Sequence, residues 1–378
     1  NVISFLMQHE QYTYPEALLF LAKKYNINVE YLEIDSEAQQ QQEEREAIAI
    51  VLKFAKQVFC QNLFTSNNDA LIYLQERGFN DTTIKKFDIG YCPKADKELI
   101  RIARKKKYNL KYLHKARIIN EKEYNRFSGR IIFPIHNLSG QVVGFGGRIL
   151  DDNNKSVKYL NSDSSELYQK SKVLYGLHLA KNHIKNTDFC YIVEGYTDVM
   201  AMSQMGIENV VSNCGTALTL DQIRLIKRFT NNITILFDSD LAGVTATIKA
   251  IDTILQQNMT PRVLQLPTQD DPASFIKNNT KTFVNQYIKN NTIDFIEFKY
   301  NLSKDNNTID LIKKTKEIIK SLSIIPDKIS QTFYVRRAAK MLNIKEEDLI
   351  FELNNINFEN SSLRRVRNIK SEIKKDSR

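Results

Sequence analysis

The stretch that decides the fold is CYIVEGYTDVMAMSQM, residues 190–205, together with its partner ITILFDSDLAGVTATIKAIDTIL, residues 233–255. Each begins with a short run of β-branched and aromatic residues and continues into an apolar run of helical length, which predicts a strand followed by a helix. The acidic motifs EGYTD and FDSD fall where the two strands end. In a parallel α/β sheet, ligands bind at the carboxyl ends of the strands. We therefore expect four carboxylates at one edge of the sheet, those of Glu194, Asp198, Asp238 and Asp240.

Carboxylates gathered in this way repel one another unless a cation neutralises them, and hard divalent ions such as Mg²⁺ take oxygen ligands. Gly195 allows the backbone beside Glu194 to turn tightly and lets a substrate or ion approach closely. The alternative is that the Asp residues are only N-caps of the helices that follow, since Asp is common at helix starts. Two such motifs in this order on successive strands favour a metal-dependent phosphoryl-transfer site.

The pair of motifs resembles the Toprim domain of bacterial-type DNA primases, in which Glu-Gly-Tyr-x-Asp is followed by Phe-Asp-x-Asp. Three further segments resemble primase segments in the same order: RFSGRIIFPIHNLSGQVVGFGGRIL (126–150), KYLNSDSSELYQKSKVLYGL (158–177) and NCGTALT (213–219). The resemblance runs with few gaps from about Ser4 to Asn355, and a match of that length and order is specific to primases among Toprim proteins.

The resemblance implies a mixed α+β and α/β fold, with a parallel Toprim sheet, an N-terminal α+β basic subdomain and a C-terminal helical bundle. The pattern along the chain agrees, because strands and helices alternate from 188 to 267 and only helical patterns follow Ser274. We expect six parts: a remnant of a zinc-binding domain (1–34), a linker (35–43), the basic subdomain of the polymerase core (44–186), the Toprim catalytic subdomain (187–273), the helical subdomain (274–357) and a basic disordered tail (358–378).

The resemblance implies the synthesis of short RNA primers on single-stranded DNA. In that reaction a 3′-hydroxyl attacks the α-phosphate of a nucleoside triphosphate, and carboxylate-held metal ions align and neutralise the reacting oxygens. Asp198, Asp238 and Asp240 would be metal ligands, and Glu194 would be a ligand or a general base.

A third acidic motif follows the last strand of the alternating region. The family has Asp-Pro-Asp near Leu-Pro, and this chain has LPTQDDPASF. Asp271 matches the first position and is expected to be a further metal ligand. Ala273 stands at the second position, and Asp270 would point elsewhere on an extended chain. This departure puts one metal site in doubt.

Basic and polar side chains are expected to bind the nucleotide and the template. Arg suits bidentate phosphate contacts and Lys suits point-charge contacts. The positions that match the family are Arg126, Arg130, Arg148, Lys158, Tyr159, Asn161 and Lys170, with Gly195, Gly215 and Thr216 in the loops that approach the substrate.

Composition narrows the class of protein. Basic residues outnumber acidic ones, 54 to 44, for a net charge of +10. This excess fits a polyanionic partner, although a solvated lysine-rich surface gives the same count.

The four cysteines have no C-x-x-C spacing, so neither a disulfide framework nor a zinc site is indicated, and a reducing compartment is expected. Cys190 and Cys214 fall in apolar runs, which predicts small core residues. No run reaches transmembrane length, and there is no secretory signal pattern.

The resemblance also gives expectations for cofactors and partners. Mg²⁺ or Mn²⁺ is expected at the carboxylates, and Zn²⁺ only in the missing N-terminal part, whose Cys and His ligands this sequence does not contain. The expected partners are the single-stranded DNA template, nucleoside triphosphates and the RNA–DNA hybrid, with a replicative helicase for the full-length protein and no membrane. We expect a monomer in the cytoplasm at a bacterial replisome, or in an organelle if the source is eukaryotic.

Local patterns predict several further elements. A helix is expected from Glu44, and NNDALIYLQERGF predicts a helix capped by Asn68 and ended by Gly78. RIIFPIHNLSGQVVGFGGRIL predicts a hairpin turning at NLSG, and we interpret GFGG as a close-packed strand end from which Arg148 projects, rather than as a phosphate cradle. The basic segment 104–117, RKKKYNLKYLHKAR, can follow a nucleic-acid backbone with its tyrosines stacked on bases, or can be only a solvated lysine run.

Two other interpretations stay open. A different Toprim enzyme, a topoisomerase or nuclease, would share the acidic motifs, and the 17 tyrosines do not exclude a nucleophilic one. The primase-like hairpin and KYLN segments argue against it. A degenerate primase that binds template or replisome partners without making primers is suggested by Ala273 and the absent zinc ribbon. The four retained carboxylates count against that hypothesis, because an inactive scaffold has no chemical need for them.

Overall fold

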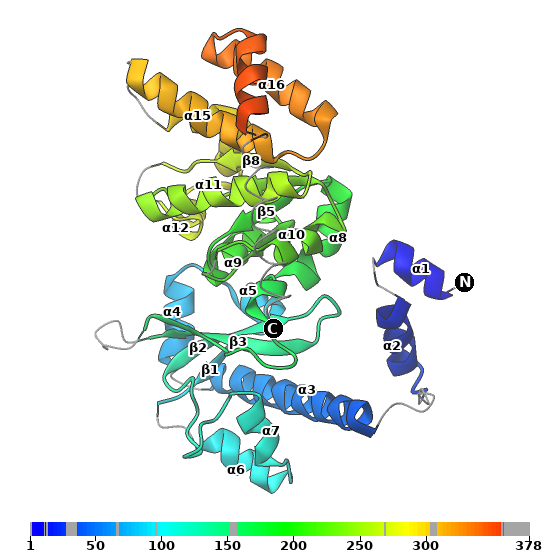
Figure 1. The fold of residues 1–378 in the computed structure, drawn as a ribbon. Helices are drawn as coiled ribbons and strands as arrows, with labels where there is room; N and C mark the ends of the chain where they lie inside the picture. The colour runs from blue at the N-terminus through cyan, green and yellow to red at the C-terminus, as the bar shows by residue number, and fades with distance from the viewer. Residues whose placement is uncertain are drawn as a thin grey trace, which may run out of the picture.

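A computed structural model describes residues 2–358 except 11, 13, 28–35, 66–67, 95–96, 151–156, 216, 268–269, 303–307 and 357. Two sheets follow one another along the long axis of the molecule (Figure 1), with helices α15 and α16 at one end and the short helices α6 and α7 at the other. One sheet is antiparallel and the other is largely parallel. The mixed α+β and α/β fold expected from the sequence is therefore confirmed.

The first sheet has the order β1-β2-β3-β4 and consists of β1 (Gly90–Cys92), β2 (Arg130–His136), β3 (Val142–Ile149) and β4 (Tyr159–Asn161). β2 and β3 form the predicted hairpin, in which the amide of Asn137 donates to the carbonyl of Gln141 over 2.9 Å. Gly140 closes the turn with a φ of 79°, a conformation that glycine adopts without strain.

The GFGG run of β3 packs directly against aromatic side chains. A Cβ atom at Gly146 would lie 2.5 Å from the ring of Tyr196, and one at Gly147 would lie 2.7 Å from the ring of Phe127. A well-packed interior cannot absorb such overlaps without moving its neighbours. The close packing expected of GFGG is confirmed, but the expectation that it ends the strand is wrong, because β3 continues through the buried Arg148 to Ile149.

Five helices surround the first sheet: α3 (Ser36–Leu63), α4 (Asp69–Glu76), α5 (Asp81–Lys86), α6 (Glu98–Lys105) and α7 (Leu110–Lys115). The predicted cap and terminator of α4 are confirmed, since Asn68 Oδ1 accepts from the amide of Ala70 over 2.9 Å and Gly78 has a φ of 94°.

The predicted start of α3 at Glu44 is wrong. The polar segment expected to be a linker is helical from Ser36 onward, because Gln and Glu have good helix propensity even where no apolar pattern marks a helix; Asp35 lies outside the described residues.

The second sheet has the order β6-β5-β7-β8-β9 and consists of β5 (Cys190–Val193), β6 (Val210–Ser212), β7 (Asn232–Ile235), β8 (Thr260–Leu264) and β9 (Thr292–Asp294). The first four of these strands are parallel. The predicted alternation of strand and helix is confirmed by α9 (Tyr196–Met205), α10 (Leu220–Lys227) and α11 (Leu241–Gln256). β9 is antiparallel to β8 and lies where we expected helix only.

The core continues from one sheet to the other. Along β5, Cys190 and Ile192 belong to the hydrophobic cluster that includes α8 (Leu177–Thr187), α10 and α11. Val193 belongs to a second cluster that also contains Ile131 and Phe133 of β2. Because one cluster includes side chains from both sheets, their relative position is fixed by packing. Both Cys190 and Cys214 are buried, as expected.

Helices follow the second sheet, as the sequence predicts: α12 (Pro272–Asn278), α13 (Lys281–Asn291), α14 (Phe295–Asn301), α15 (Thr308–Ile324) and α16 (Lys328–Leu342), with a further helical stretch over 346–356. Buried Lys299 joins them to α11, since its Nζ donates to Ser321 Oγ over 2.5 Å and lies 3.4 Å from Asp252 Oδ1. The basic tail from 359 onward lies outside the described residues.

At the N-terminal end, α1 (Val2–His9) and α2 (Tyr14–Lys24) form a small separate cluster through Leu6, Tyr12 and Ala17. Two ion pairs connect this helix pair to the second sheet region, Glu10 with Lys181 at 2.7 Å and Glu16 with Arg228 at 3.2 Å. In the part of the chain that the structure describes, no helix is both long and apolar enough to cross a membrane.

Candidate functional site

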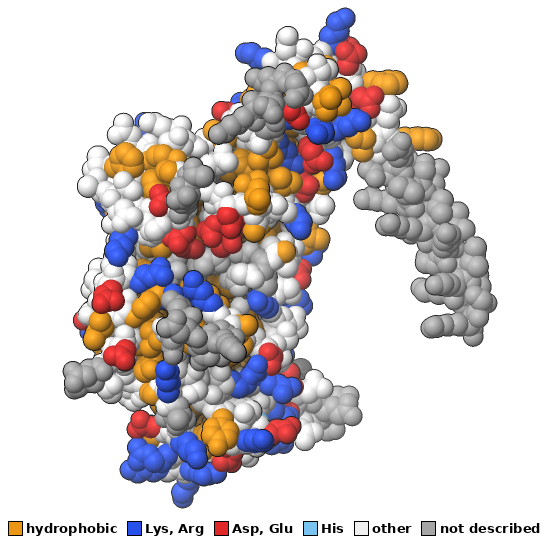
Figure 2. All heavy atoms as spheres, turned by 90° about the vertical axis from the view of Figure 1, so that its left-hand side faces the viewer, with side chains coloured by type: hydrophobic (Ala, Val, Ile, Leu, Met, Phe, Trp, Pro, Cys, Tyr) orange, Lys and Arg blue, Asp and Glu red, His pale blue; other side chains and the backbone are white. Residues whose placement is uncertain are grey.

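The predicted acidic residues meet at the carboxyl ends of three neighbouring strands. Glu194 follows β5, Asp238 and Asp240 follow β7, and Asp271 follows β8. Asp198 lies in the first turn of α9. Figure 2 shows acidic side chains gathered in the middle of one face, with Lys and Arg side chains beside them. The edge predicted from the sequence therefore exists, and it faces a basic surface.

Asp198 is the most buried of these carboxylates, with 6% of its surface exposed. Its Oδ2 accepts from the amide of Gly195 over 2.8 Å, and it also accepts a hydrogen bond from the backbone of Ala273. Burial, and then the charge of Asp271, raise the pKa of Asp198 to about 7. A carboxyl with this pKa is only partly ionised near neutral pH, and an added cation would favour its charged form.

Glu194 and Asp238 interact directly. The amide of Asp238 donates to Glu194 Oε1 over 3.4 Å, and the carbonyl of Glu194 accepts from Ser212 Oγ over 2.6 Å. Burial raises the pKa of Glu194, and the charge of Asp238 raises it further. The pKa of Asp238 is raised by burial and then by the charge of Asp271. The carboxylates therefore carry mutual repulsion that a bound cation would relieve.

The N-cap alternative also holds for two of the five. Asp240 Oδ1 accepts from the amide of Gly243 over 2.7 Å and caps α11, and Asp271 Oδ1 accepts from the amide of Ser274 over 2.6 Å and caps α12. Each of these caps uses Oδ1 only, so capping and metal ligation through Oδ2 are compatible. A cap also fixes the carboxylate at the end of its strand, which is where a shared ion needs it.

Ala273 departs from the family motif, and the structure shows what stands there instead. The residue supplies a backbone donor to Asp198 rather than a second carboxylate. Asp270 does not replace the missing group, because its Oδ1 accepts from Ser274 Oγ at 3.4 Å beside the α12 cap.

The donor set fits a hydrated Mg²⁺ ion. All five side chains offer hard oxygen atoms. Burial, and then the charge of neighbouring carboxylates, raises the pKa of Glu194, Asp198 and Asp238. Among the described residues, no three acidic, His or Cys side chains lie close enough to enclose one ion. Mg²⁺ does not require such a cage, since it keeps several waters and is commonly held by one or two carboxylates together with substrate phosphates.

The basic side of the site joins the predicted Arg148 to two residues that sequence reasoning missed, Tyr73 and Arg77. Arg148 is buried, with its guanidinium carbon 4.5 Å from the centre of the Tyr73 ring and 5.9 Å from that of Tyr159. Arg77 lies over the same Tyr73 ring at 5.5 Å. Tyr159 also lies close enough to Asp198 for the two side chains to interact electrostatically. The i, i+4 spacing of Tyr73 and Arg77 on α4 is the one signal that the sequence offered for this pair.

Two of the predicted phosphate-binding arginines are occupied by other groups. Arg130 is buried and donates to the carbonyls of Val157 and Lys158 over 2.9 and 3.2 Å, so the structure gives it a role in holding β4 and does not support a phosphate contact. Arg126 forms a two-pronged ion pair with Asp163, whose pKa this hydrogen bond lowers. A phosphate would have to replace Asp163 at that guanidinium.

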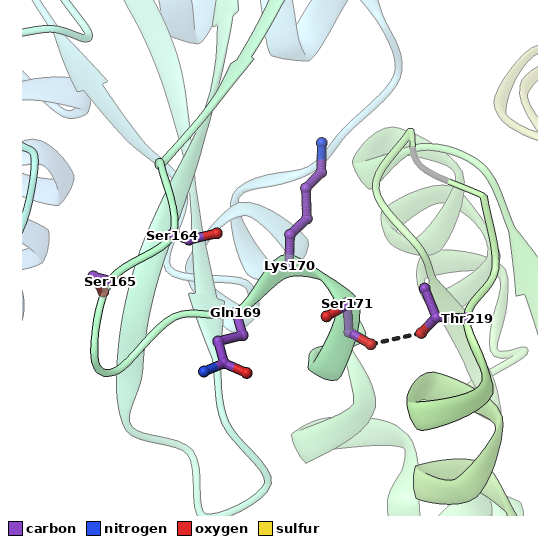
Figure 3. Close-up of a pocket in the computed structure, with 6 residues that line it drawn as sticks. All are labelled: Ser164, Ser165, Gln169, Lys170, Ser171 and Thr219. Carbon is purple, nitrogen blue, oxygen red and sulfur yellow. Dashed lines mark hydrogen bonds between the residues drawn. The ribbon is translucent and has the colours of Figure 1, made fainter. Parts of the chain in front are cut away.

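Lys170 lies at a cavity between the two sheets. Figure 3 shows this cavity of about 560 Å³, lined by Ser164, Ser165, Gln169, Lys170, Ser171 and Thr219. Thr219 Oγ1 donates to the carbonyl of Ser171 over 2.6 Å and closes one side. Gly215 is exposed in the loop before Thr219 and has a φ of 70°. Lys158 is exposed, and Thr216 lies outside the described residues.

Tyr196, from the EGYTD motif, ties the acidic edge to the first sheet. Its hydroxyl donates to Asn161 Oδ1 over 2.6 Å, and Asn161 Nδ2 donates to the carbonyl of Cys214 over 3.3 Å. Its ring stacks on Phe133 at a centroid distance of 4.9 Å. Asn161, expected to contact the nucleotide, is therefore engaged in holding β4, α9 and the loop after β6 together.

Tyr196→Phe is expected to lower the free energy of unfolding by about 1–2 kcal/mol, because it leaves Asn161 without a buried donor. Tyr175→Phe is the matched control, since the buried Tyr175 hydroxyl has no hydrogen-bond partner among the described residues. That change should be neutral or stabilising. Urea denaturation of both variants measures the difference, and equal effects of the two substitutions would contradict the Tyr196–Asn161 linkage.

Comparisons with known proteins agree with the geometry. A family described as DNA primase catalytic core, N-terminal domain, matches residues 58–181, and a Toprim-like family matches 191–276. The chain is 33% identical over 358 residues to a DNA primase of Clostridium acetobutylicum, covering 92% of this chain and 58% of that protein. It is 31% identical over 364 residues to a DNA primase of Staphylococcus aureus, covering 93% of this chain and 60% of that protein. The chain thus spans about three fifths of the length of these relatives.

Solved structures give the same result. The Aquifex aeolicus primase, a crystal structure of zinc-binding and RNA polymerase domains, matches with a TM-score of 0.74 and 29% identity, covering 92% of this chain and 83% of that one. A DnaG primase catalytic domain bound to ssDNA matches with a TM-score of 0.71 and 27% identity, covering 81% of this chain and 99% of that one. These matches include both sheets and the helices around them.

Proposed function

Because this chain belongs to the bacterial-type DNA primases, whose two catalytic-core domains it carries, we propose that it synthesises short RNA primers on single-stranded DNA. The reaction would join ribonucleotides through attack of a 3′-hydroxyl on the α-phosphate of a nucleoside triphosphate. The observation that carries this proposal is the meeting of the EGYTD and FDSD carboxylates at one edge, on a face where Lys and Arg side chains lie beside acidic ones (Figure 2). No observation favours a topoisomerase, a nuclease or a binding-only protein.

The carboxylates would act as metal ligands. Asp198, Asp238, Asp240 and Asp271 would hold Mg²⁺ or Mn²⁺, which when bound neutralises charge on the phosphoryl oxygens and aligns the nucleophile and leaving group. Glu194 would act as a further ligand or would accept the proton of the attacking hydroxyl, a task that its raised pKa favours.

The basic residues would hold the phosphates and the template. Arg77, exposed over the ring of Tyr73, presents a guanidinium group suited to phosphate oxygens, and the charge of Arg148 would act from its buried position over the same ring. Lys170 would supply a point charge at its cavity. A related catalytic domain has been solved bound to ssDNA, which supports a single-stranded template for this chain. We place the protein in the bacterial cytoplasm beside the replicative helicase, since its relatives are bacterial DNA primases.

The test is ribonucleotide incorporation on single-stranded DNA with Mg²⁺ or Mn²⁺, comparing this chain with Asp238→Ala. The parent should incorporate nucleotides and the variant should not, because the variant lacks an acidic residue of the cluster without losing a core side chain. Circular dichroism and thermal melting confirm that the variant is folded. Absence of incorporation by the parent, even with a zinc-binding domain added in trans and a primer to extend, would overturn the proposal and favour the binding-only interpretation.

A further inference from the structure

One end of the molecule concentrates positive charge that the proposed reaction does not use. Between 94 and 117 the sequence has ten Lys or Arg residues and two Asp or Glu residues. All ten basic side chains are exposed. This stretch, here named the basic tip, carries a net charge of +8, whereas the whole chain carries +10. It comprises α6, α7 and their connections, at the opposite end of the molecule from α15 and α16 (Figure 1).

The helices of the basic tip direct the charge outward. α6 buries Leu99, Ile100 and Ala103 against the core below the first sheet and leaves its basic residues in solvent. The tyrosines do not join them: the ring of Tyr108 packs on Phe54 at a centroid distance of 4.5 Å. The expectation that tyrosines of this segment stack on bases is therefore wrong at Tyr108, while its cations remain available.

Only some of these cations have acidic partners. Arg101 pairs with Glu98 at 3.0 Å, Arg104 pairs with Glu123 at 2.6 Å, and Lys115 pairs with Glu44. Within the described residues, four basic side chains of the tip make no ion pair, hydrogen bond or cation–π contact, whereas Lys97 and Lys106 lie over the rings of Tyr124 and Phe54: the four are Lys105, Lys107, Lys111 and Arg117. Unpaired charges of one sign at one end of a protein attract a polyanion and give binding that depends strongly on salt.

The composition of this surface distinguishes a nucleic acid from a protein partner. Protein interfaces are anchored by buried aromatic and other large apolar side chains. None of the exposed large apolar side chains in the described part of the chain falls between 94 and 117. Contacts to a phosphate backbone need only Lys, Arg and polar donors. The observations therefore favour nucleic acid.

The positive charge also continues toward the acidic edge. Lys115 and Arg117 line a groove of about 830 Å³ together with Arg126. This groove shares Ser164 and Ser165 with the cavity at Lys170. The groove is also lined by Glu121, Asp163 and Glu166, so basic and acidic side chains alternate along it. A strand lying in the Lys170 cavity has a continuous path along this groove to the basic tip.

We propose that the basic tip is an accessory binding surface that holds the phosphate backbone of single-stranded DNA away from the reaction site. It lengthens the stretch of template that the protein retains without taking part in the chemistry. Its contribution is specific to templates long enough to reach it, and it is independent of base sequence.

The test is binding of fluorescent oligothymidylates of increasing length, measured by anisotropy over a range of salt concentrations. The tip variant carries Lys105→Gln, Lys107→Gln and Lys111→Gln, and the control variant carries Lys316→Gln, Lys320→Gln and Lys340→Gln, three exposed lysines of the bundle. For long oligonucleotides the tip variant should bind at least about tenfold more weakly near 100 mM salt, with the salt slope reduced by about 2, or roughly 0.7 per lost phosphate contact. The control variant should match the parent, and short oligonucleotides should not distinguish the three proteins.

Equal losses in the tip and control variants would show a general effect of net charge and overturn the proposal, as would a tip variant that binds long oligonucleotides as the parent does. Binding is measured without nucleotide incorporation, so failure of the proposed primer synthesis and failure of the basic tip are separate results. In an active parent, the tip variant should lose the additional incorporation that long templates give over short ones, and on short templates it should match the parent.

Discussion

Asp198→Asn is expected to abolish nucleotide incorporation while it removes a pH-dependent loss of stability from the metal-free protein. Activity should fall about 10³-fold or more, because the proposed phosphoryl-transfer site would lose a charged oxygen ligand. The stability effect arises because Asp198 is buried and lies near the charge of Asp271. One substitution should thus separate what the carboxylate does for chemistry from what it costs the fold.

The sign of the stability effect follows from the raised pKa. In the folded protein burial raises the pKa of Asp198 to about 7, whereas the ordinary pKa of an aspartate side chain is 3.8. Between these values the folded state keeps a proton that the unfolded state has released. The carboxyl therefore costs no stability below the lower pKa, costs more as pH rises, and reaches its full cost above the higher one. From pH 5 to pH 8 the parent should lose about 2–3 kcal/mol relative to the variant, which has no titrating group at this position.

Urea denaturation of both proteins with a chelator present, at pH 5 and at pH 8, measures this difference. In the variant the amide side chain faces the backbone N–H groups of Gly195 and Ala273, which donate to the carboxylate in the parent. The free-energy cost of this change does not depend on pH, so it cancels when the two pH values are compared. At pH 8, added Mg²⁺ should stabilise the parent more than the variant, because a ligand that binds only the folded state raises its stability. Parallel pH profiles would contradict the raised pKa, and a variant that still incorporates nucleotides would remove Asp198 from the site.

Gly243→Ala is expected to disrupt the FDSD loop. A Cβ atom at this position would lie 2.1 Å from the backbone carbonyl oxygen of Asp238. Neither atom can be moved by the rotation of a side chain, so the overlap must be relieved by the backbone. The first turn of α11 must move, and the Asp240 cap on the amide of Gly243 moves with it. We expect a loss of about 2–3 kcal/mol in the free energy of unfolding, from the overlap, and at least about a hundredfold loss of incorporation, from misplaced ligands.

Lys249→Ala is the control for this prediction, since it places alanine on the exposed face of the same helix. It should change neither quantity by much, because exposed positions away from caps and packing contacts have small effects. Thermal melting and the incorporation assay are read together. Normal stability and activity in Gly243→Ala would show that the loop and helix can separate without cost, against the packing described above.

The sequence identified the acidic site well because each motif encodes two things at once. EGYTD and FDSD end a buried strand and begin a helix, and the carboxylates occupy the turn between them, so their shared edge follows from strand topology alone. The N-cap alternative proved compatible with the site at Asp240 and Asp271 rather than opposed to it.

What the sequence could not provide depends on contacts between distant segments. Arg130 looked equivalent to its neighbours, yet its guanidinium is occupied by carbonyls of the segment 157–158. Tyr73 and Arg77 join the site only because α4 lies beside β3, which no local pattern reveals. Strand β9 has three residues and exists because β8 offers an edge to pair with.

The contact between Gly146 and Tyr196 restricts how this chain can be recombined with its relatives. The tyrosine belongs to the acidic motif and the glycine to the opposite sheet, and a Cβ atom at the glycine would lie 2.5 Å from the tyrosine ring. A chimaera that takes one half from this chain and the other from a primase lacking either residue would bring a methyl group against the ring or leave a void beside it. The two halves are therefore exchangeable only as a matched pair, and any divergence at one position must be accompanied by change at the other.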